Sequence, residues 1–441
     1  MEVVVERSNM IMALRRVERN RGTAGIDEMT VAERRTYLKE HWPKIKEALL
    51  EGSYQPQAVR RVEIAKPAGG MRQLGIPTVV DRLIQQALNQ VLSPIFDPNF
   101  SQSSYGFRPG RKAHQAVRKA QADVASGKRW IVDMDLEKFF DRVNHDILMS
   151  RLARGINDKR LLAVIRRYLE AGMLADGVVI ERHEGTPQGG PLSPLLANIA
   201  LSVLDEHFDQ QWQELMGTQN QRTRRRKNGL GTWRLIRYCD DFVVMVHGER
   251  RHAEVLREEV ADVLATLGLR LSLEKTRVVH IDEGFDFLGH NIRRQRKRGT
   301  SKYYVYTRPS KKAVQAIKDK VGAKTYRSTR NQDLDQLITS LNQMLAGWAR
   351  HFRHGVSKAV FSAIDSHAWG RLMRWIRAKH QGKGRLGMKD LRRRFCDQGW
   401  RFAHNGVVFT GASSVTVTRY RYRGSRIPTP WTIDPAAVAT G

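Results

Sequence analysis

The feature that most constrains this chain is a pair of adjacent aspartates between two apolar, β-prone stretches. Residues 235–246 read Leu-Ile-Arg-Tyr-Cys-Asp-Asp-Phe-Val-Val-Met-Val, which predicts two short strands joined by a turn at Asp240 and Asp241. Two ionised carboxylates side by side repel each other, so a turn that holds them together needs cations to stabilise it. The pair therefore predicts a metal site, although an ordinary surface Asp-Asp turn is the better interpretation of such a pair taken alone.

Further acidic residues lie upstream in a similar setting. Residues 130–136 read Trp-Ile-Val-Asp-Met-Asp-Leu, another predicted buried strand, in which Asp133 and Asp135 share one face because strand side chains alternate. Three carboxylates on two neighbouring strands can hold two Mg²⁺ about 3.5–4 Å apart, the arrangement that transfers nucleotidyl groups in line. Mg²⁺ prefers a few carboxylates together with substrate phosphate oxygens. Periodicity alone leaves open whether Asp133 or Asp135 is the third ligand.

The distribution of charge predicts a polyanionic partner. The 441 residues include 76 Lys and Arg against 45 Asp and Glu, a net charge of +31. Residues 291–441 hold 32 basic and 7 acidic side chains, whereas residues 1–290 hold 44 and 38. A merely solvated surface mixes the two signs more evenly, so this excess indicates contacts with nucleic-acid phosphates and a strong salt dependence.

Cysteine usage and hydropathy indicate an intracellular protein. Cys239 and Cys396 are far apart and form no CxxC pair, so neither a disulfide framework nor a cysteine zinc site is expected. No apolar run approaches the roughly 20 residues of a membrane span. Residues 1–7 contain acids and lack a long apolar stretch, so they are not expected to be a signal peptide.

Local patterns predict a mixture of helices and strands, and the length suggests about three domains. We expect mostly helix over residues 1–50, a hairpin over 57–78, a helix from Val79 to Leu92 that ends before Pro94, a helix over 194–213, a basic loop over 222–227, and helical apolar stripes over 334–348 and 360–375.

Seven segments stand in an order that closely resembles the reverse transcriptases encoded by bacterial group II introns. Any one segment is weak evidence, but seven in order between about residues 20 and 380 are highly specific. They are Lys66 to Arg72, Ser104 to Arg111 (SYGFRPGR), Asp135 to Asp141 (DLEKFFD), Glu184 to Pro194 (EGTPQGGPLSP), Tyr238 to Asp241 (YCDD), Leu269 to Thr276 (LRLSLEKT) and Phe285 to His290 (FDFLGH).

The resemblance implies an α+β fold, a right-hand polymerase with fingers, palm and a helical thumb, followed by a small basic DNA-binding region. The expected domains are an N-terminal extension with the start of the fingers at 1–56, fingers at 57–129, palm at 130–292, thumb or maturase domain at 293–380, and the basic C-terminal region at 381–441.

The resemblance also assigns the catalytic residues. The family pattern of an acid, further residues and an aromatic pair selects Asp135, which with Asp240 and Asp241 would hold two Mg²⁺ ions. One ion would lower the pKa of the primer 3′-hydroxyl, and the other would steady the triphosphate and the leaving pyrophosphate. Lys275 would protonate the pyrophosphate, although a surface lysine is nearly as good an interpretation.

The expected contacts to the incoming deoxynucleotide come from three segments. Phe140 would lie under the sugar, where a ribonucleotide 2′-hydroxyl would collide with it; an ordinary core phenylalanine is the alternative. Lys66 and Arg72 flank a glycine-rich turn and would close over the triphosphate, or belong to an unremarkable basic hairpin. Gln188 and Gly189 would lie against the template base and the nucleotide, since glycine permits close backbone approach.

Other residues are expected to contact nucleic acid. Arg108 and Arg111 are expected to contact phosphates, and Tyr238 is also expected to contact nucleic acid. Leu288 and Gly289 belong to the segment that resembles the primer grip, and Trp348 belongs to the segment that resembles the maturase domain. The chain departs from the family pattern at His351-Phe352, where a tyrosine is expected, and at Cys239, which replaces the usual alanine and could slow or reshape turnover.

No cysteine pairs or His-Asn-His site follow residue 380, so the chain resembles the compact class that lacks the endonuclease domain. The resemblance predicts a cytoplasmic bacterial enzyme that binds intron RNA, an RNA template with a DNA primer, target DNA and dNTPs, and that assists RNA splicing and retrotransposition. Two alternatives stay open: a maturase that no longer polymerises, and a reverse transcriptase that serves phage defence or a CRISPR locus.

Overall fold

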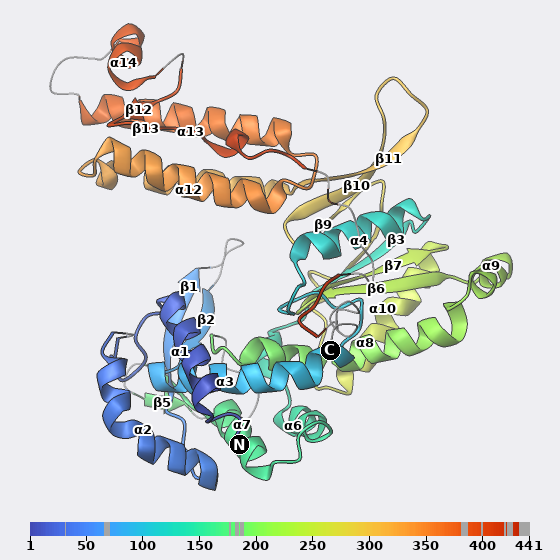
Figure 1. Cartoon of the computed structure of the whole chain (residues 1–441). Coiled ribbons are helices and arrows are strands. Elements are labelled where there is room, and N and C mark those ends of the chain that lie inside the picture. Colours follow the sequence, from blue (N-terminus) through green and yellow to red (C-terminus); the bar gives the residue numbers. More distant parts are fainter. Residues whose placement is uncertain are drawn as a thin grey trace, which may run out of the picture. The chain divides into compact units, whose positions relative to one another are not determined.

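The chain forms two compact units in the computed structural model, which are described separately (Figure 1). The first unit comprises Met1–Ala116, Trp130–Val278 and Gly424–Gly441, and the second comprises Val117–Arg129 and Val279–Arg423. The residues that the structure describes are 1–30, 32–65, 71–175, 178–180, 185, 189–380, 387–397, 400–418, 420 and 427–431.

Helices make up most of the first unit. Most of them contribute apolar side chains to one large core, to which α3 and α8 contribute residues along much of their length. The helices are α1 (Arg7–Asn20), α2 (Arg34–Glu51), α3 (Val79–Phe96), η1 (Asp97–Asn99), α5 (Phe139–Arg142), α6 (His145–Ala153), α7 (Lys159–Glu170), α8 (Ser193–Gln211), η2 (Trp212–Met216), α9 (Gln219–Lys227) and α10 (Arg250–Ala265). Helix α4 (Ala113–Ala125) begins in this unit and continues into the second.

Two four-stranded sheets complete the first unit. One has the order β2-β1-β4-β5 and the other β6-β7-β3-β8. The strands are β1 (Val59–Ala65), β2 (Met71–Ile76), β3 (Trp130–Met134), β4 (Met173–Ala175), β5 (Val178–Ile180), β6 (Thr232–Tyr238), β7 (Asp241–His247) and β8 (Arg277–His280), of which β8 runs on into the second unit. Helix α10 packs on β3 and β7 and α8 packs on β6, so the central strands are buried and read as continuous apolar runs.

The second unit joins a three-stranded sheet, of order β11-β10-β9, to a group of helices. Helices α12 and α13, drawn side by side in orange in Figure 1, bury the two apolar stripes that the sequence predicts. The elements are β9 (Phe285–Phe287), β10 (His290–Arg296), β11 (Tyr303–Pro309), α11 (Lys311–Lys324), η3 (Arg327–Thr329), α12 (Leu334–Phe352), α13 (Lys358–Lys379), α14 (Met388–Phe395), β12 (Ala403–His404), β13 (Val407–Val408) and η5 (Ala412–Ser414).

Two local expectations are wrong. Helix α3 continues through Pro94 to Phe96, because a proline so near the end of a helix removes a single backbone hydrogen bond. The expected basic loop is the helix α9, which a capping box of Thr218 and Gln221 starts. The α+β class is confirmed, and the division into five domains stays a prediction. Within the described part of the chain, no helix is both long enough and apolar enough to cross a bilayer.

Candidate active site

The pairing of strands brings the three predicted aspartates together. Strand β3 runs antiparallel to β7 with Met134 opposite Phe242, so the next residue, Asp135, leaves the sheet beside Asp241. Tyr238 pairs with Asp241, which leaves Cys239 and Asp240 as a two-residue turn between β6 and β7. We call residues 232–247 the aspartate hairpin.

The turn places Cys239 in an unusual backbone conformation. Its φ is +58°, in the left-handed region that two-residue hairpin turns require and that glycine or asparagine usually supplies. The Cys239 side chain is buried, and burial together with the charge of Asp240 raises the pKa of its thiol to about 12. Cys239 is therefore an uncharged packing residue beneath the turn.

Charge repulsion is built into the carboxylate group. Burial, followed by the negative charges of Asp240 and then Asp135, raises the pKa of Asp241 to about 7, while Lys275 partly offsets them. A carboxylate close to others of the same sign favours its protonated form unless a cation is supplied.

Lys275 supplies one such cation. Its Nζ lies 2.5 Å from Oδ2 of Asp135, and this hydrogen bond raises the pKa of the Lys275 ammonium. The contact follows from backbone pairing, because Leu271 bridges to Leu136 and the Ser272 amide donates to the Asp135 carbonyl over 2.8 Å. Lys275 is thereby held, protonated, at the edge of the carboxylate group.

The donor set fits hard divalent cations. Asp135, Asp240 and Asp241 offer only carboxylate oxygens, which Mg²⁺ prefers, and their mutual repulsion is relieved by positive charge. Among the described residues no group of three or more His, Cys, Asp or Glu is already arranged as a metal cage. In nucleotidyl transfer, Mg²⁺ also takes phosphate oxygens and water as ligands, so the carboxylates need supply only part of its coordination.

A buried arginine beneath the turn was missed by the sequence reasoning. Arg237 is 0% exposed and donates two hydrogen bonds from Nε and Nη2 to Asp205. It also donates to Asn198 Oδ1 over 3.0 Å, to Ser104 Oγ over 2.9 Å and to the Cys239 carbonyl over 3.1 Å. The last bond ties the network to the turn that carries Asp240. A cation inside an otherwise apolar strand is the sequence signal that could have identified it.

Two residues that were predicted to contact phosphates are buried in the loop after η1. Arg108 is 6% exposed, and its guanidinium donates to Asp97 Oδ1 over 2.8 Å and to backbone carbonyls. Arg111 is 9% exposed, donates to the side chain and carbonyl of Gln102 and lies over the ring of Tyr105. These arrangements support the loop, and they do not favour the phosphate contacts that the sequence suggested.

The exposed residue of this loop is Phe107. Its side chain is 60% exposed, its φ is +52°, and its ring lies 6.2 Å from that of Tyr238 at the end of β6. The sequence reasoning missed Phe107 because the adjacent arginines looked more suited to nucleic acid. An exposed aromatic ring beside the aspartate hairpin can stack on a base or a sugar.

Phe140 and Gly189 lie where their predicted roles allow a substrate contact. In α5 the ring of Phe139 is buried, whereas Phe140 is half-buried, edge-to-face at 5.0 Å from it. Gly189 has φ +137°, and a Cβ there would lie 2.6 Å from the Gly75 carbonyl, so a larger residue does not fit. Lys66, Gln188 and the side chain of Arg72 lie outside the described part of the structure, so their contacts stay predictions.

The remaining predicted residues belong to the second unit. Leu288 and Gly289, at φ +49° and +76°, form the turn between β9 and β10. Trp348 on α12 is partly buried, with its ring 4.5 Å from Phe352 and 5.8 Å from Phe361. Much of the Trp348 ring therefore packs between helices, and its predicted contact with RNA stays a prediction.

Comparison with known proteins gives two family matches. Residues 64–292 match the family described as reverse transcriptase (RNA-dependent DNA polymerase), and residues 314–395 match the group II intron maturase-specific domain.

Similar curated proteins include Protein YkfC of Escherichia coli, 35% identical over 309 residues that cover 66% of this chain and 81% of YkfC. The group II intron-encoded protein LtrA of Lactococcus lactis is 32% identical over 311 residues, 60% of this chain and 52% of LtrA. Nuclear intron maturase 1 of Arabidopsis thaliana, a mitochondrial protein, is 26% identical over 299 residues, 50% of this chain and 41% of that protein. The matched region thus spans most of YkfC and about half of LtrA.

Proposed function

Because the chain belongs to the reverse transcriptases that carry a group II intron maturase domain, we propose that it extends a DNA primer on RNA with two Mg²⁺ ions at Asp135, Asp240 and Asp241. As a member of this family it is an RNA-directed DNA polymerase, and its mixed helices and sheets agree with the family's right-hand fold. The observation that supports the metal assignment is the register of β3, β6 and β7, by which Asp135 follows β3 beside Asp241 and next to the turn that carries Asp240.

The proposed chemistry divides between the ions and the chain. When bound, the ions lower the pKa of the primer hydroxyl and neutralise the triphosphate. The three aspartates would hold and orient them, and the buried Arg237 network keeps the turn in place. Lys275 holds a proton beside Asp135 and can donate it to the leaving pyrophosphate.

Phe140 is proposed to select the sugar. The half-buried ring of Phe140 belongs to helix α5, which begins a few residues after Asp135 and the end of β3. A ring held by Phe139 and the core cannot move aside for a 2′-hydroxyl, so a deoxynucleotide binds and a ribonucleotide collides. We expect Lys66, Arg72, Gln188 and Gly189 to complete the nucleotide site.

The proposed partners follow from the two family matches. An RNA template with its DNA primer would engage the polymerase region, and the parent intron RNA would engage the maturase domain to promote splicing. Copying at a target DNA site would serve intron mobility. We expect this to take place in the bacterial cytoplasm, and the excess of 25 positive charges in residues 291–441 suits such polyanions.

Primer extension tests the proposal. The full chain should extend a DNA primer on RNA with dNTPs and Mg²⁺, and EDTA should stop it. Asp240→Ala/Asp241→Ala should lower the rate by at least about a thousandfold, since it removes most of the metal-holding charge, while RNA affinity is retained. Asp262→Ala, which removes an exposed aspartate of α10, is the control.

The outcomes separate the candidate functions. Extension by the Asp240/Asp241 double variant would show that the metal site is wrongly assigned. If the wild-type chain binds intron RNA tightly but extends no primer under any divalent metal, the chain is a maturase that does not polymerise.

A further inference from the structure

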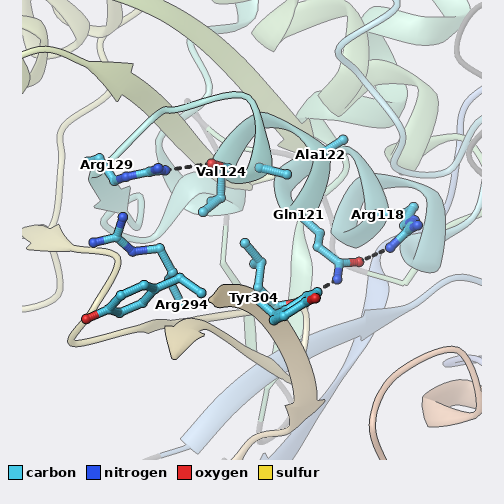
Figure 2. A pocket seen from close by; sticks show the side chains of 10 residues that line it. Arg118, Gln121, Ala122, Val124, Arg129, Arg294 and Tyr304 are labelled. Atoms are coloured by element: carbon cyan, nitrogen blue, oxygen red, sulfur yellow. Dashed lines mark hydrogen bonds between the residues drawn. The ribbon is translucent and has the colours of Figure 1, made fainter. Parts of the chain in front are cut away.

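The second unit contains a cavity that the polymerase site does not use. It has a volume of about 540 Å³ and lies between the C-terminal part of α4 and the hairpin β10–β11. We call residues 290–309 the basic hairpin. Figure 2 shows the side chains that line the cavity, chiefly Arg118, Gln121, Arg129, Arg294, Tyr303 and Tyr304.

Side-chain hydrogen bonds fix the shape of this cavity. The Nε2 atom of Gln121 donates to the Val305 carbonyl over 2.7 Å, which ties α4 to β11, and its Oε1 atom accepts from Arg118. On the opposite side, Nη1 of Arg129 donates to the Val124 carbonyl over 2.7 Å, as the dashed line in Figure 2 shows. The hydrogen bond from Gln121 therefore holds helix α4 and strand β11 together along the cavity.

The wall of the cavity is positively charged. The guanidinium groups of Arg129 and Arg294 lie on the same side (Figure 2), and burial, together with the charge of Arg294, lowers the pKa of Arg129. None of the described lining residues is acidic; Asp282, outside the lining, accepts two hydrogen bonds of 2.6 Å from Arg294. An anion placed in the cavity would relieve this excess.

Exposed aromatic rings lie among these cations. Tyr303 is 59% exposed and Tyr304 is 45% exposed, so both rings are accessible to a ligand. The Arg294 guanidinium lies 5.0 Å from the Tyr303 ring centre, and Lys297 Nζ lies 5.9 Å from that of Tyr304. Rings and cations presented together are typical of surfaces that stack unpaired bases and hold the adjoining phosphates.

We propose that this cavity binds unpaired nucleotides of a nucleic-acid strand, with a base stacked on Tyr303 or Tyr304 and phosphates at Arg118, Arg129 and Arg294. The proposal rests on the proposed function in one respect, since a polymerase handles single-stranded template. A duplex keeps its bases stacked on each other and presents only phosphates, which leaves the tyrosines without a role. The volume is within the range of sites that hold a ligand of nucleotide size.

Fluorescence anisotropy of the full chain in EDTA tests the proposal without any dependence on catalysis. The probes are a labelled 12-nucleotide RNA, the DNA of the same sequence, and the corresponding duplex. Tyr303→Ala/Tyr304→Ala should weaken binding of the single strands by at least about fivefold and leave the duplex unaffected, because the loss of stacking on aromatic rings is specific to unpaired bases. Tyr303→Phe/Tyr304→Phe keeps the rings and should bind like the wild type.

Tyr326→Ala is the matched control, since it removes another tyrosine of the second unit that is 60% exposed and does not line the cavity. Ultraviolet cross-linking should attach the single strand to the peptide that contains Tyr303 and Tyr304. Equal affinity for RNA and DNA would identify base and phosphate as the recognised groups, and tighter binding of RNA would add the ribose hydroxyl; both support the proposal.

Three results would overturn it: unchanged single-strand binding by the double alanine variant, an equal loss with Tyr326→Ala, or cross-links that map only elsewhere. These failures are distinct from failure of the proposed function. If the wild-type chain extends no primer but binds single strands through Tyr303 and Tyr304, the cavity proposal stands and the proposed polymerase function fails. If it extends the primer but its single-strand binding does not depend on these tyrosines, the polymerase function stands and the cavity proposal fails.

Discussion

The aspartate hairpin and the basic hairpin use charge in opposite ways. In the aspartate hairpin the strands are mostly buried, and the charged side chains are few: Asp240 and Asp241 at the turn, Arg237 with its network beneath it, and Arg234 on β6. In the basic hairpin the cations follow the strands and the connecting turn, and most are exposed. Between Asp286 and Asp319 the sequence contains ten Lys and Arg residues and no acid.

This difference predicts how tightly function and stability are linked in each hairpin. A buried charge is stable only with its partner, so changes beneath the aspartate turn should cost both folding and catalysis. Exposed cations interact with water and contribute little to folding, so changes in the basic hairpin should cost binding alone. Four experiments test whether the two hairpins differ in this way.

The largest expected effect is that of Arg237→Ala. Removing this fully buried guanidinium leaves the Asp205 carboxylate without its cation, which should lower the free energy of unfolding by about 3–5 kcal/mol. Chemical denaturation followed by circular dichroism measures the loss. Arg237→Ala/Asp205→Ala should be less destabilised than the sum of the two single variants, because the pair acts as a unit. Additive costs would mean that the network is not the support inferred here.

A smaller effect is expected at Phe140, beside the aspartate turn. Phe140→Ala should reduce discrimination against ribonucleotides by about tenfold or more, since a pocket that loses bulk no longer excludes an extra group. The ratio of kcat/KM for a dNTP and its rNTP measures it. The neighbouring Phe139 is buried and serves as control: Phe139→Leu should change stability and leave sugar choice unchanged. If Phe140→Ala discriminates against ribonucleotides as strongly as the wild type does, Phe140 is an ordinary core residue.

The parts of this site that sequence could predict are those encoded locally. Apolar runs around Asp135 and around the Asp240-Asp241 pair specify β3, β6 and β7, and pairing of those strands then forces the carboxylates together. The stripe that begins at Leu334 specifies α12 for the same reason, because one face of a helix repeats every three or four residues.

The parts that sequence could not predict depend on contacts between distant segments. Arg237 meets Ser104 and Asp205, 133 and 32 residues away, so the cation can be noticed in the sequence of the strand but its partners cannot be identified there. Arg108 was read as a phosphate contact for the same reason, since its partner Asp97 is identified only once the loop is folded. Composition suggests binding wherever arginine is frequent, but burial decides which arginines remain available.

A third test concerns the exposed end of the basic hairpin. Lys297→Gln/Arg298→Gln/Lys302→Gln should reduce the slope of log Kobs against log salt concentration for single-stranded RNA by about 0.7 for each phosphate that the variant no longer neutralises. The unfolding free energy should change by no more than about 0.5 kcal/mol, because these side chains are solvated. A marked loss of stability with no change in slope would reverse the contrast between the hairpins.

The smallest effect expected is a pH dependence at the base of the basic hairpin. Hydrogen bonds from Arg294 lower the pKa of Asp282, and partial burial opposes them. Because the folded-state pKa is depressed, the pair stabilises the fold above the ordinary pKa of an aspartate, and this contribution disappears as the pH falls through the folded-state value. The pair is partly exposed, so we expect less than about 1 kcal/mol. Unfolding of the wild type and of Asp282→Asn should therefore differ slightly at pH 7 and converge in acid. A difference of several kcal/mol would mean that the basic hairpin also depends on a buried charge pair, as the aspartate hairpin does.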